Sequence, residues 1–173
     1  MKTLRLALVL IPIALLAGCA GYQRGPLPDS KPASVYLEPI QNEAYISGFA
    51  PLFQNELRKA ILNSRLLNLS DDPEDADMIA YIRLRDFDEE PIGFLESDTG
   101  QPISARVQIS AILSLWDSPL KDVSLVENEV VRVDSAVYSS PQTAFTAPVD
   151  QSKPAIARNL AAKTTLEMEL KRP

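Results

Sequence analysis

Residues 103–117 read I-S-A-R-V-Q-I-S-A-I-L-S-L-W-D, and every odd-numbered position from Ile103 to Leu115 is apolar. The even-numbered positions include the polar and charged residues Ser104, Arg106, Gln108, Ser110 and Ser114. Successive side chains of a strand point to opposite faces, whereas a helix cannot keep such an alternation on one side. The stretch therefore predicts a long strand with one apolar face that needs a cover.

Three further segments have strand character, namely residues 34–40, 77–88 and 123–138. In residues 77–88 the alternation places Met78, Ala80, Ile82 and Leu84 on one face, with Ile79, Tyr81, Arg83, Arg85 and Phe87 on the other. The alternation of residues 123–138 blurs around Glu127–Val130, which indicates a bulge or a twist. Residues 66–69 are apolar and short, so they suit an extended segment or a minor edge strand.

Two segments have helical spacing instead. Apolar residues recur three and four positions apart from Phe49 to about Asn63, and Ser47 is the expected N-cap. A second apolar stripe runs to about Lys171, with Asp150 or Ser152 as the expected N-cap. These starts would put Pro51 and Pro154 in the first turns, where a missing N–H costs little.

The order is thus strand, helix, two or three strands, helix. Long strands with one apolar face and two amphipathic helices predict an α+β two-layer sandwich. Both helices would pack on one face of a mainly antiparallel or mixed sheet of about four strands. Residues 89–101 and 139–149 contain proline or glycine and are expected to be loops, the first a hairpin connection with a mobile loop. Residues 70–75 form an acidic turn, which we interpret as solvated rather than as a calcium loop.

The start of the chain has the layout of a secretory signal peptide. Lys2 and Arg5 precede an apolar run, which ends in Leu16-Ala17-Gly18-Cys19. This arrangement resembles the lipobox of bacterial lipoproteins. The resemblance implies a signal peptide over residues 1–18 and a lipid-modified Cys19, followed by a linker to residue 33 and a single α+β domain over residues 34–173. An ordinary signal peptide followed by a stray cysteine is the alternative.

Composition narrows the function classes. Without Lys2 and Arg5 the formal charge changes from −6 to −8, so the chain is a poor candidate for binding nucleic acid. It contains no histidine and a single cysteine. A Ser-His-Asp site, a Cys-His site and a histidine-based metal cluster are therefore excluded. We predict no enzyme activity, no metal site and no cofactor.

The chain also resembles the LPS-assembly lipoprotein family, LptE. The resemblance is carried by the Gly18–Tyr22 start, the strand 35–37 leading into the helix 49–62, the strand opening 76–79, the strand 107–116 and the closing helix around Ala157–Ala161. It implies a plug inside the outer-membrane β-barrel LptD that helps to deliver lipopolysaccharide and to assemble the barrel. Ala20 in place of Asp after the cysteine points to the periplasmic face of the outer membrane.

Two groups of residues are candidates for binding. Arg83, Arg85, Arg106 and Arg132 would share the polar face of neighbouring strands, where guanidiniums could cluster and bind lipopolysaccharide phosphates. Ion pairs with acids such as Asp86, Glu129 or Asp134 are the competing interpretation. Partner contact is expected from the apolar loop residues Phe94, Leu95 and Phe145.

A different kind of envelope lipoprotein fits the same pattern. The chain would then be an accessory subunit of a transporter or a regulator of cell-wall synthesis. A β-barrel partner distinguishes the two hypotheses.

Overall fold

The computed structural model describes residues 31–95, 98–117, 123–138 and 148–173. It confirms an α+β sandwich of helices packed against one mixed sheet. The helices are α2 (Phe49–Leu62) and α3 (Pro148–Lys171). The strands are β1 (Ala33–Leu37), β2 (Gln41–Asn42), β3 (Leu67–Ser70), β4 (Met78–Leu95), β5 (Asp98–Asp117) and β6 (Ser124–Tyr138).

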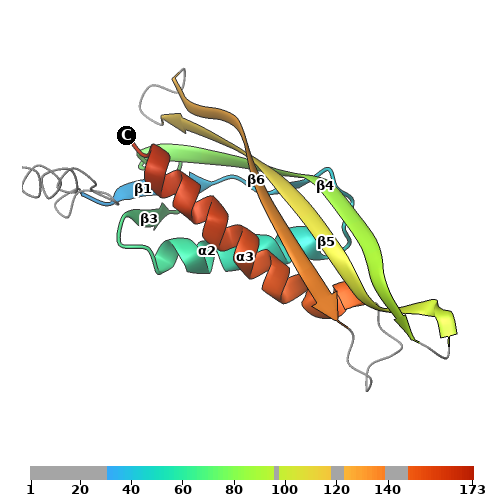
Figure 1. Ribbon diagram of the computed structural model, residues 1–173. Coiled ribbons are helices and arrows are strands. Elements are labelled where there is room, and N and C mark those ends of the chain that lie inside the picture. The colour runs from blue at the N-terminus through green and yellow to red at the C-terminus, as the bar shows by residue number, and fades with distance from the viewer. Residues whose placement is uncertain (1–30, 96–97, 118–122, 139–147) are drawn as a thin grey trace, which may run out of the picture. The chain divides into compact units, whose positions relative to one another are not determined.

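The sheet runs in the order β3-β1-β4-β5-β6, and β2 pairs with β4 beside this path (Figure 1). β4, β5 and β6 form an antiparallel meander, while β1 lies parallel between β3 and β4. The sheet has six strands instead of about four because the short segments β2 and β3 join it. The apolar run at residues 66–69 was expected to be either an extended segment or a minor edge strand. It forms the edge strand β3.

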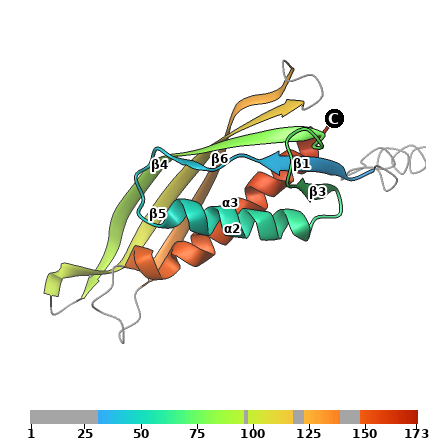
Figure 2. The ribbon, with the colours of Figure 1, turned by 180° about the vertical axis from the view of Figure 1, so that it is seen from behind.

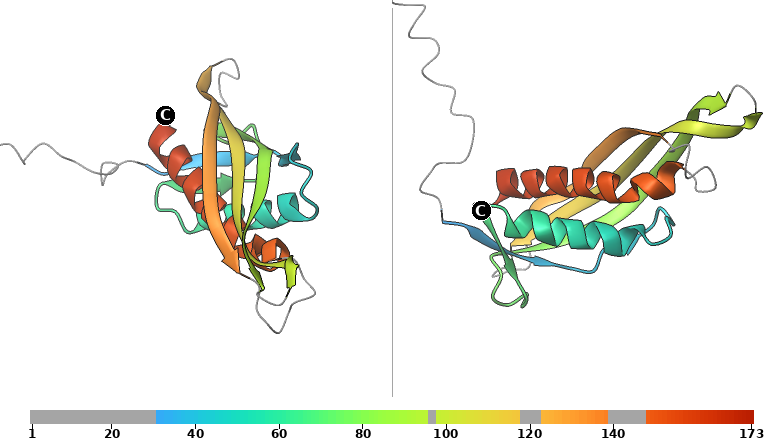
Figure 3. Two further views of the ribbon diagram at one scale, coloured as in Figure 1. Left: turned by 45° about the vertical axis from the view of Figure 1, so that its right-hand side comes forward. Right: turned by 90° about the horizontal axis from the view of Figure 1, so that it is seen from below.

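Both helices lie side by side on the same face of the sheet (Figures 2 and 3). The odd-numbered residues of β5 from Ala105 to Leu115 are buried beneath them, as the alternation predicts. From α2 the core takes Phe49, Phe53, Leu57 and Ile61, one stripe at four-residue spacing. Glu56 on α2 forms an ion pair with Arg158 on α3, at 3.5 Å between Oε2 and Nε, and this pair links the two helices.

A pair of residues closes the start of β1 onto the start of β4. The Asp77 carboxylate Oδ2 accepts hydrogen bonds from the Ser34 backbone N–H at 2.7 Å and from its hydroxyl at 2.8 Å. The same hydroxyl accepts the Asp77 backbone N–H at 2.8 Å. These hydrogen bonds, the backbone one first, hold the pKa of Asp77 below its ordinary value of 3.8.

Both helix starts differ from the prediction. Gly48, not Ser47, is the N-cap of α2, and its φ of 70° is one that a residue with a side chain rarely adopts. No side chain caps that helix end. α3 begins at Pro148, upstream of both expected caps, so Pro154 lies inside the helix rather than in its first turn.

A β-bulge divides β4 and corrects the predicted face of Phe87. The register with β5 shifts between Leu84 and Phe87, where two residues, Arg85 and Asp86, oppose Ser110. An extra residue reverses the alternation beyond it. Phe87 therefore packs against the core instead of sharing the outer face with Tyr81.

The segment 89–101 is a hairpin connection, as predicted, but its strands stay paired through Pro91 and Gly93, where the sequence suggested a loop. β4 continues to Leu95 and β5 begins at Asp98, with register shifts between Pro91 and Leu95. Beyond Leu84 the described strands leave β4 without a neighbour on the side away from β5. Pro91 therefore lies on a sheet edge, where a missing N–H is tolerated. The hairpin projects past the helices (Figures 2 and 3).

Candidate functional site

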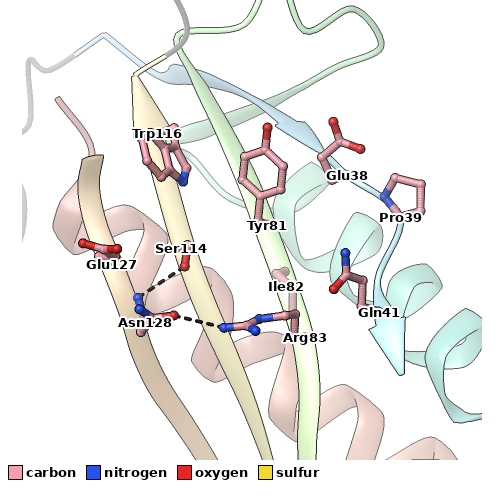
Figure 4. Close-up of a pocket in the computed structure, with 10 residues that line it drawn as sticks. All are labelled: Glu38, Pro39, Gln41, Tyr81, Ile82, Arg83, Ser114, Trp116, Glu127 and Asn128. Atoms are coloured by element: carbon pink, nitrogen blue, oxygen red, sulfur yellow. Dashed lines mark hydrogen bonds between the residues drawn. The ribbon is translucent and has the colours of Figure 1, made fainter. Parts of the chain in front are cut away.

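The face of the sheet opposite the helices carries a hollow of about 350 Å³. Alternation brings Tyr81 and Arg83 of β4 to this face, together with Ser114 and Trp116 of β5. The segment after β1 and the bulged part of β6 form the two sides. The full lining is Glu38, Pro39, Gln41, Tyr81, Ile82, Arg83, Ser114, Trp116, Glu127 and Asn128 (Figure 4).

A second, smaller hollow of about 230 Å³ continues the first one toward the acidic turn before β4. It shares Glu38, Tyr81 and Trp116 with its larger neighbour and adds Pro73 and Ile79. The shared residues lie in one row, with Tyr81 between Trp116 and Glu38 (Figure 4). The two hollows therefore form one shallow groove, which we call the aromatic groove.

A second bulge, in β6, organises the polar side of the groove. The register of β5 with β6 shifts between Leu113 and Leu115, as the blurred pattern at Glu127–Val130 predicts. Asn128 adopts a left-handed φ of 55°, and its backbone N–H donates to the Ser114 hydroxyl at 3.2 Å. Its side-chain Oδ1 accepts a hydrogen bond from Arg83 Nη2 at 3.0 Å. The bulge thus holds Arg83 against the sheet.

The charge of the groove is uneven. Arg83 faces Glu43 at 3.6 Å between Nη1 and Oε1, so an acid already offsets its positive charge. Glu38 and Glu127 lie on opposite sides of the lining, and neither forms an ion pair with any residue that the structure describes. The aromatic groove is therefore net negative and has two aromatic rings between its carboxylates.

The predicted arginine cluster is spread over the sheet. Arg106 pairs with Glu90 at 3.2 Å, and Arg132 lies on β6 next to Ser110. The Gln108 amide, with its oxygen toward Arg132 Nε at 3.2 Å, bridges that arginine to Asp134 at 3.3 Å. Along β5, the row of Arg106 is six residues from the row of Arg83, or about 20 Å at 3.3 Å per residue.

Arg85 differs from the other three arginines. It lies in the β4 bulge and is exposed, and its side chain makes no polar contact with the residues that the structure describes. Arg83 is the one member of the predicted set that lines the aromatic groove.

The predicted partner-binding residues lie at the hairpin end. Phe94 pairs with Pro102 near the end of β4, and 48% of its surface is exposed. Leu95 is the last residue of β4. Phe145 and the predicted lipidation site Cys19 lie outside the described residues.

The aromatic groove itself is not predicted from the sequence. Trp116 occupies an even-numbered position of residues 103–117, on the side that the alternation assigns to polar residues. The one feature of the sequence that could have indicated the groove is this tryptophan on the polar face of a strand. The contributions of Glu38 and Glu127 depend on strand order, which no local pattern carries.

The described parts of the chain offer few other sites. They contain no group of three or more Cys, Asp or Glu residues arranged to hold a metal ion. Neither described helix is both long enough and apolar enough to cross a membrane.

No protein-family model and no curated protein matches the chain. Among solved structures, the fold is similar to protein XCC0632 from Xanthomonas campestris, with a TM-score of 0.57 and 10% identity over 86% of this chain and 92% of that one. It is also similar to the hypothetical protein CT253 from Chlamydia trachomatis, with a TM-score of 0.55 and 11% identity over 80% and 96% of the two chains. A minor lipoprotein from Acinetobacter baumannii has a TM-score of 0.49 at 12% identity, over 81% and 94%. The first two likenesses show a shared fold; none of the three proteins is named as an LPS-assembly lipoprotein.

Proposed function

We propose that this chain is a lipid-anchored envelope lipoprotein that binds a partner in the bacterial envelope and catalyses no reaction. Its role would be that of an accessory subunit of an envelope transport complex. The observation that carries the proposal is the asymmetry of the sandwich. The helices cover one face of the sheet, whereas the other face is hollowed. The outer part of the hairpin, formed by the end of β4 and the start of β5 and called here the hairpin 91–102, projects past the helices (Figure 3).

The anchor in this proposal comes from the sequence at Leu16–Cys19. Diacylglycerol on the Cys19 sulfur and a further acyl chain on its amine would supply the two or more chains that stable attachment needs. Each buried CH₂ contributes about 0.8 kcal/mol to that attachment. Ala20 supports placement at the periplasmic face of the outer membrane within this proposal.

The binding role is supported by what the surface offers. Ile92 and Phe94, two positions apart in the projecting hairpin, are about half exposed, at 45% and 48%. Exposed apolar side chains at such a protruding end suit burial against another protein. Ile92 and Phe94 of the hairpin 91–102 are therefore the proposed contact with the partner.

A second candidate is a plug and assembly partner of an LptD-type barrel, which the resemblance to LptE implies. The projecting hairpin favours it, since its exposed side chains Ile92 and Phe94 can contact a barrel wall. Direct lipopolysaccharide binding through Arg83, Arg85, Arg106 and Arg132 belongs to this candidate. Arg85 is the member of that set most available to a phosphate, because the other three already make polar contacts.

A pull-down from membranes tests the proposal. The full chain carries a C-terminal tag, membranes are extracted in mild detergent, and co-purifying proteins are quantified. Recovery of an envelope transport protein at fixed stoichiometry supports the accessory role. A large β-barrel at one-to-one stoichiometry supports the plug instead. Recovery of the chain alone from cells that carry its native partners contradicts both.

A further inference from the structure

We propose that the aromatic groove binds an extended, basic segment of a partner protein. A lysine or arginine side chain of that segment would lie on Tyr81 and Trp116, with Glu38 and Glu127 as its counter-charges. This site is separate from the hairpin 91–102, and it depends neither on the lipid anchor nor on the identity of the transport complex.

The charged residues that line the groove favour a positively charged ligand. Glu38 and Glu127 lack ion-pair partners in the described part of the chain, whereas Arg83 is held by Glu43 and Asn128. An anionic ligand would have to displace Glu43 and would meet two further carboxylates. A cationic ligand meets unpaired carboxylates, and the formal charge of the chain, −6 with its leader, attracts it over a longer range.

The aromatic rings of Tyr81 and Trp116 favour a lysine or arginine side chain as the cation. Tyr81 is 41% exposed although it lies in the middle of the sheet, and it stands between Trp116 and Glu38 (Figure 4). A cation within about 6 Å of an aromatic face is attracted by the ring quadrupole, most strongly by tryptophan. The alkyl stem of lysine or arginine would lie along the exposed ring of Tyr81 while the charged end reaches a carboxylate.

The shape of the groove favours a chain over a small molecule. The two hollows join at Glu38, Tyr81 and Trp116 and together reach from Pro73 to Asn128, across the ends of several strands. Neither hollow encloses its contents, so a small ligand would leave much of its surface in water. An extended segment can occupy both hollows at once and gain contacts along its length.

Trp116 is the one tryptophan of the chain, so its fluorescence reports on the groove directly. The full chain in mild detergent is titrated with a synthetic oligolysine peptide at near-physiological ionic strength, and with oligoglutamate as the opposite charge. We expect a saturable change of Trp116 emission with oligolysine and none with oligoglutamate. The variants Glu38→Gln and Glu127→Gln should each weaken binding, and together by about tenfold or more.

The matched control is Asp88→Asn, which removes one negative charge from an exposed position further along β4, next to Gln108. It should change the affinity less than twofold, within experimental error. An equal loss in Asp88→Asn would reveal general charge attraction and overturn the proposal. So would a Trp116 response to oligoglutamate, or a concentration-dependent emission change without peptide, which would make the occupant a second copy of the chain. Far-UV circular dichroism confirms that each variant is folded, and the two glutamate variants provide independent tests.

Discussion

The Ser110 hydroxyl binds both the side chain and the backbone of Asp86. It donates a hydrogen bond to the carboxylate Oδ2 at 2.7 Å and accepts one from the Asp86 backbone N–H at 3.3 Å. Ser110 is fully buried although it lies on the face of β5 away from the helices. The pair closes the β4 bulge, and this bulge is the reason that Phe87 turns into the core.

The first prediction concerns this pair. Ser110→Ala should lower the free energy of unfolding by about 1 kcal/mol, because the exposed Asp86 loses the hydroxyl that binds both its carboxylate and its backbone N–H in a partly buried position. Urea unfolding followed by circular dichroism measures it. Ser104→Ala is the control, since Ser104 lies on the same face of β5 and its side chain has no hydrogen bond with the described residues. Equal effects of the two substitutions would contradict a specific role for Ser110.

Local sequence patterns predict part of this fold, whereas features that depend on contacts between residues far apart in the sequence are not predicted. The alternation of residues 103–117 and the helical stripe from Phe49 are local patterns, and the structure confirms both. The face of Phe87 follows from a bulge in which Asp86 is hydrogen-bonded to Ser110, 24 positions away in the sequence. Pro91 and Gly93 suggest a loop to local reasoning, yet pairing with β5 keeps them in a strand.

The second prediction concerns Asp77 and pH. Its folded pKa is depressed, so its contribution to stability is present above the ordinary value of 3.8 and is lost as the pH falls through the lower folded value. Asp77→Asn should therefore cost about 1 kcal/mol at neutral pH, a low figure because the side chain is exposed. The difference from the unchanged protein should shrink in acid. Thermal unfolding across this pH range measures it, and a constant difference would refute the role of the carboxylate.

The third prediction concerns the hairpin 91–102. Phe94→Ser should weaken recovery of the partner in the pull-down severalfold and leave the thermal midpoint unchanged, because Phe94 is half exposed and outside the core. Leu170→Ser is a suitable control, since Leu170 is 61% exposed on α3. Undiminished recovery with Phe94→Ser would remove Phe94 from the interface.

The fourth prediction concerns the anchor. Cys19→Ser should abolish incorporation of radiolabelled palmitate and move the protein from the membrane fraction to the soluble fraction, because no acyl chain remains to be buried. Ala20→Ser is the control and should keep the label. Membrane association without Cys19 would show that another surface holds the protein there.

The site was harder to predict than the fold. The sequence indicates that Arg83 and Arg106 lie on one sheet face, but the spacing between them depends on the register of β4 with β5. Contacts with Glu43, Glu90 and Gln108 depend on which strands become neighbours. Neither register nor strand order has a local signature, so the sequence predicts the sheet face on which these arginines lie but not their separation or their partners.

The parallel placement of β1 between β3 and β4 bears on how the protein folds after synthesis. Ser34 finds its partner Asp77 43 positions later, whereas β4, β5 and β6 are joined by consecutive hairpins. Contacts between distant positions close slowly. A chain that emerges N-terminus first therefore presents β1 long before its two neighbours exist. We expect β1 to join last, and amide hydrogens of β1 to exchange with deuterium earlier than those of β5 in the folded protein.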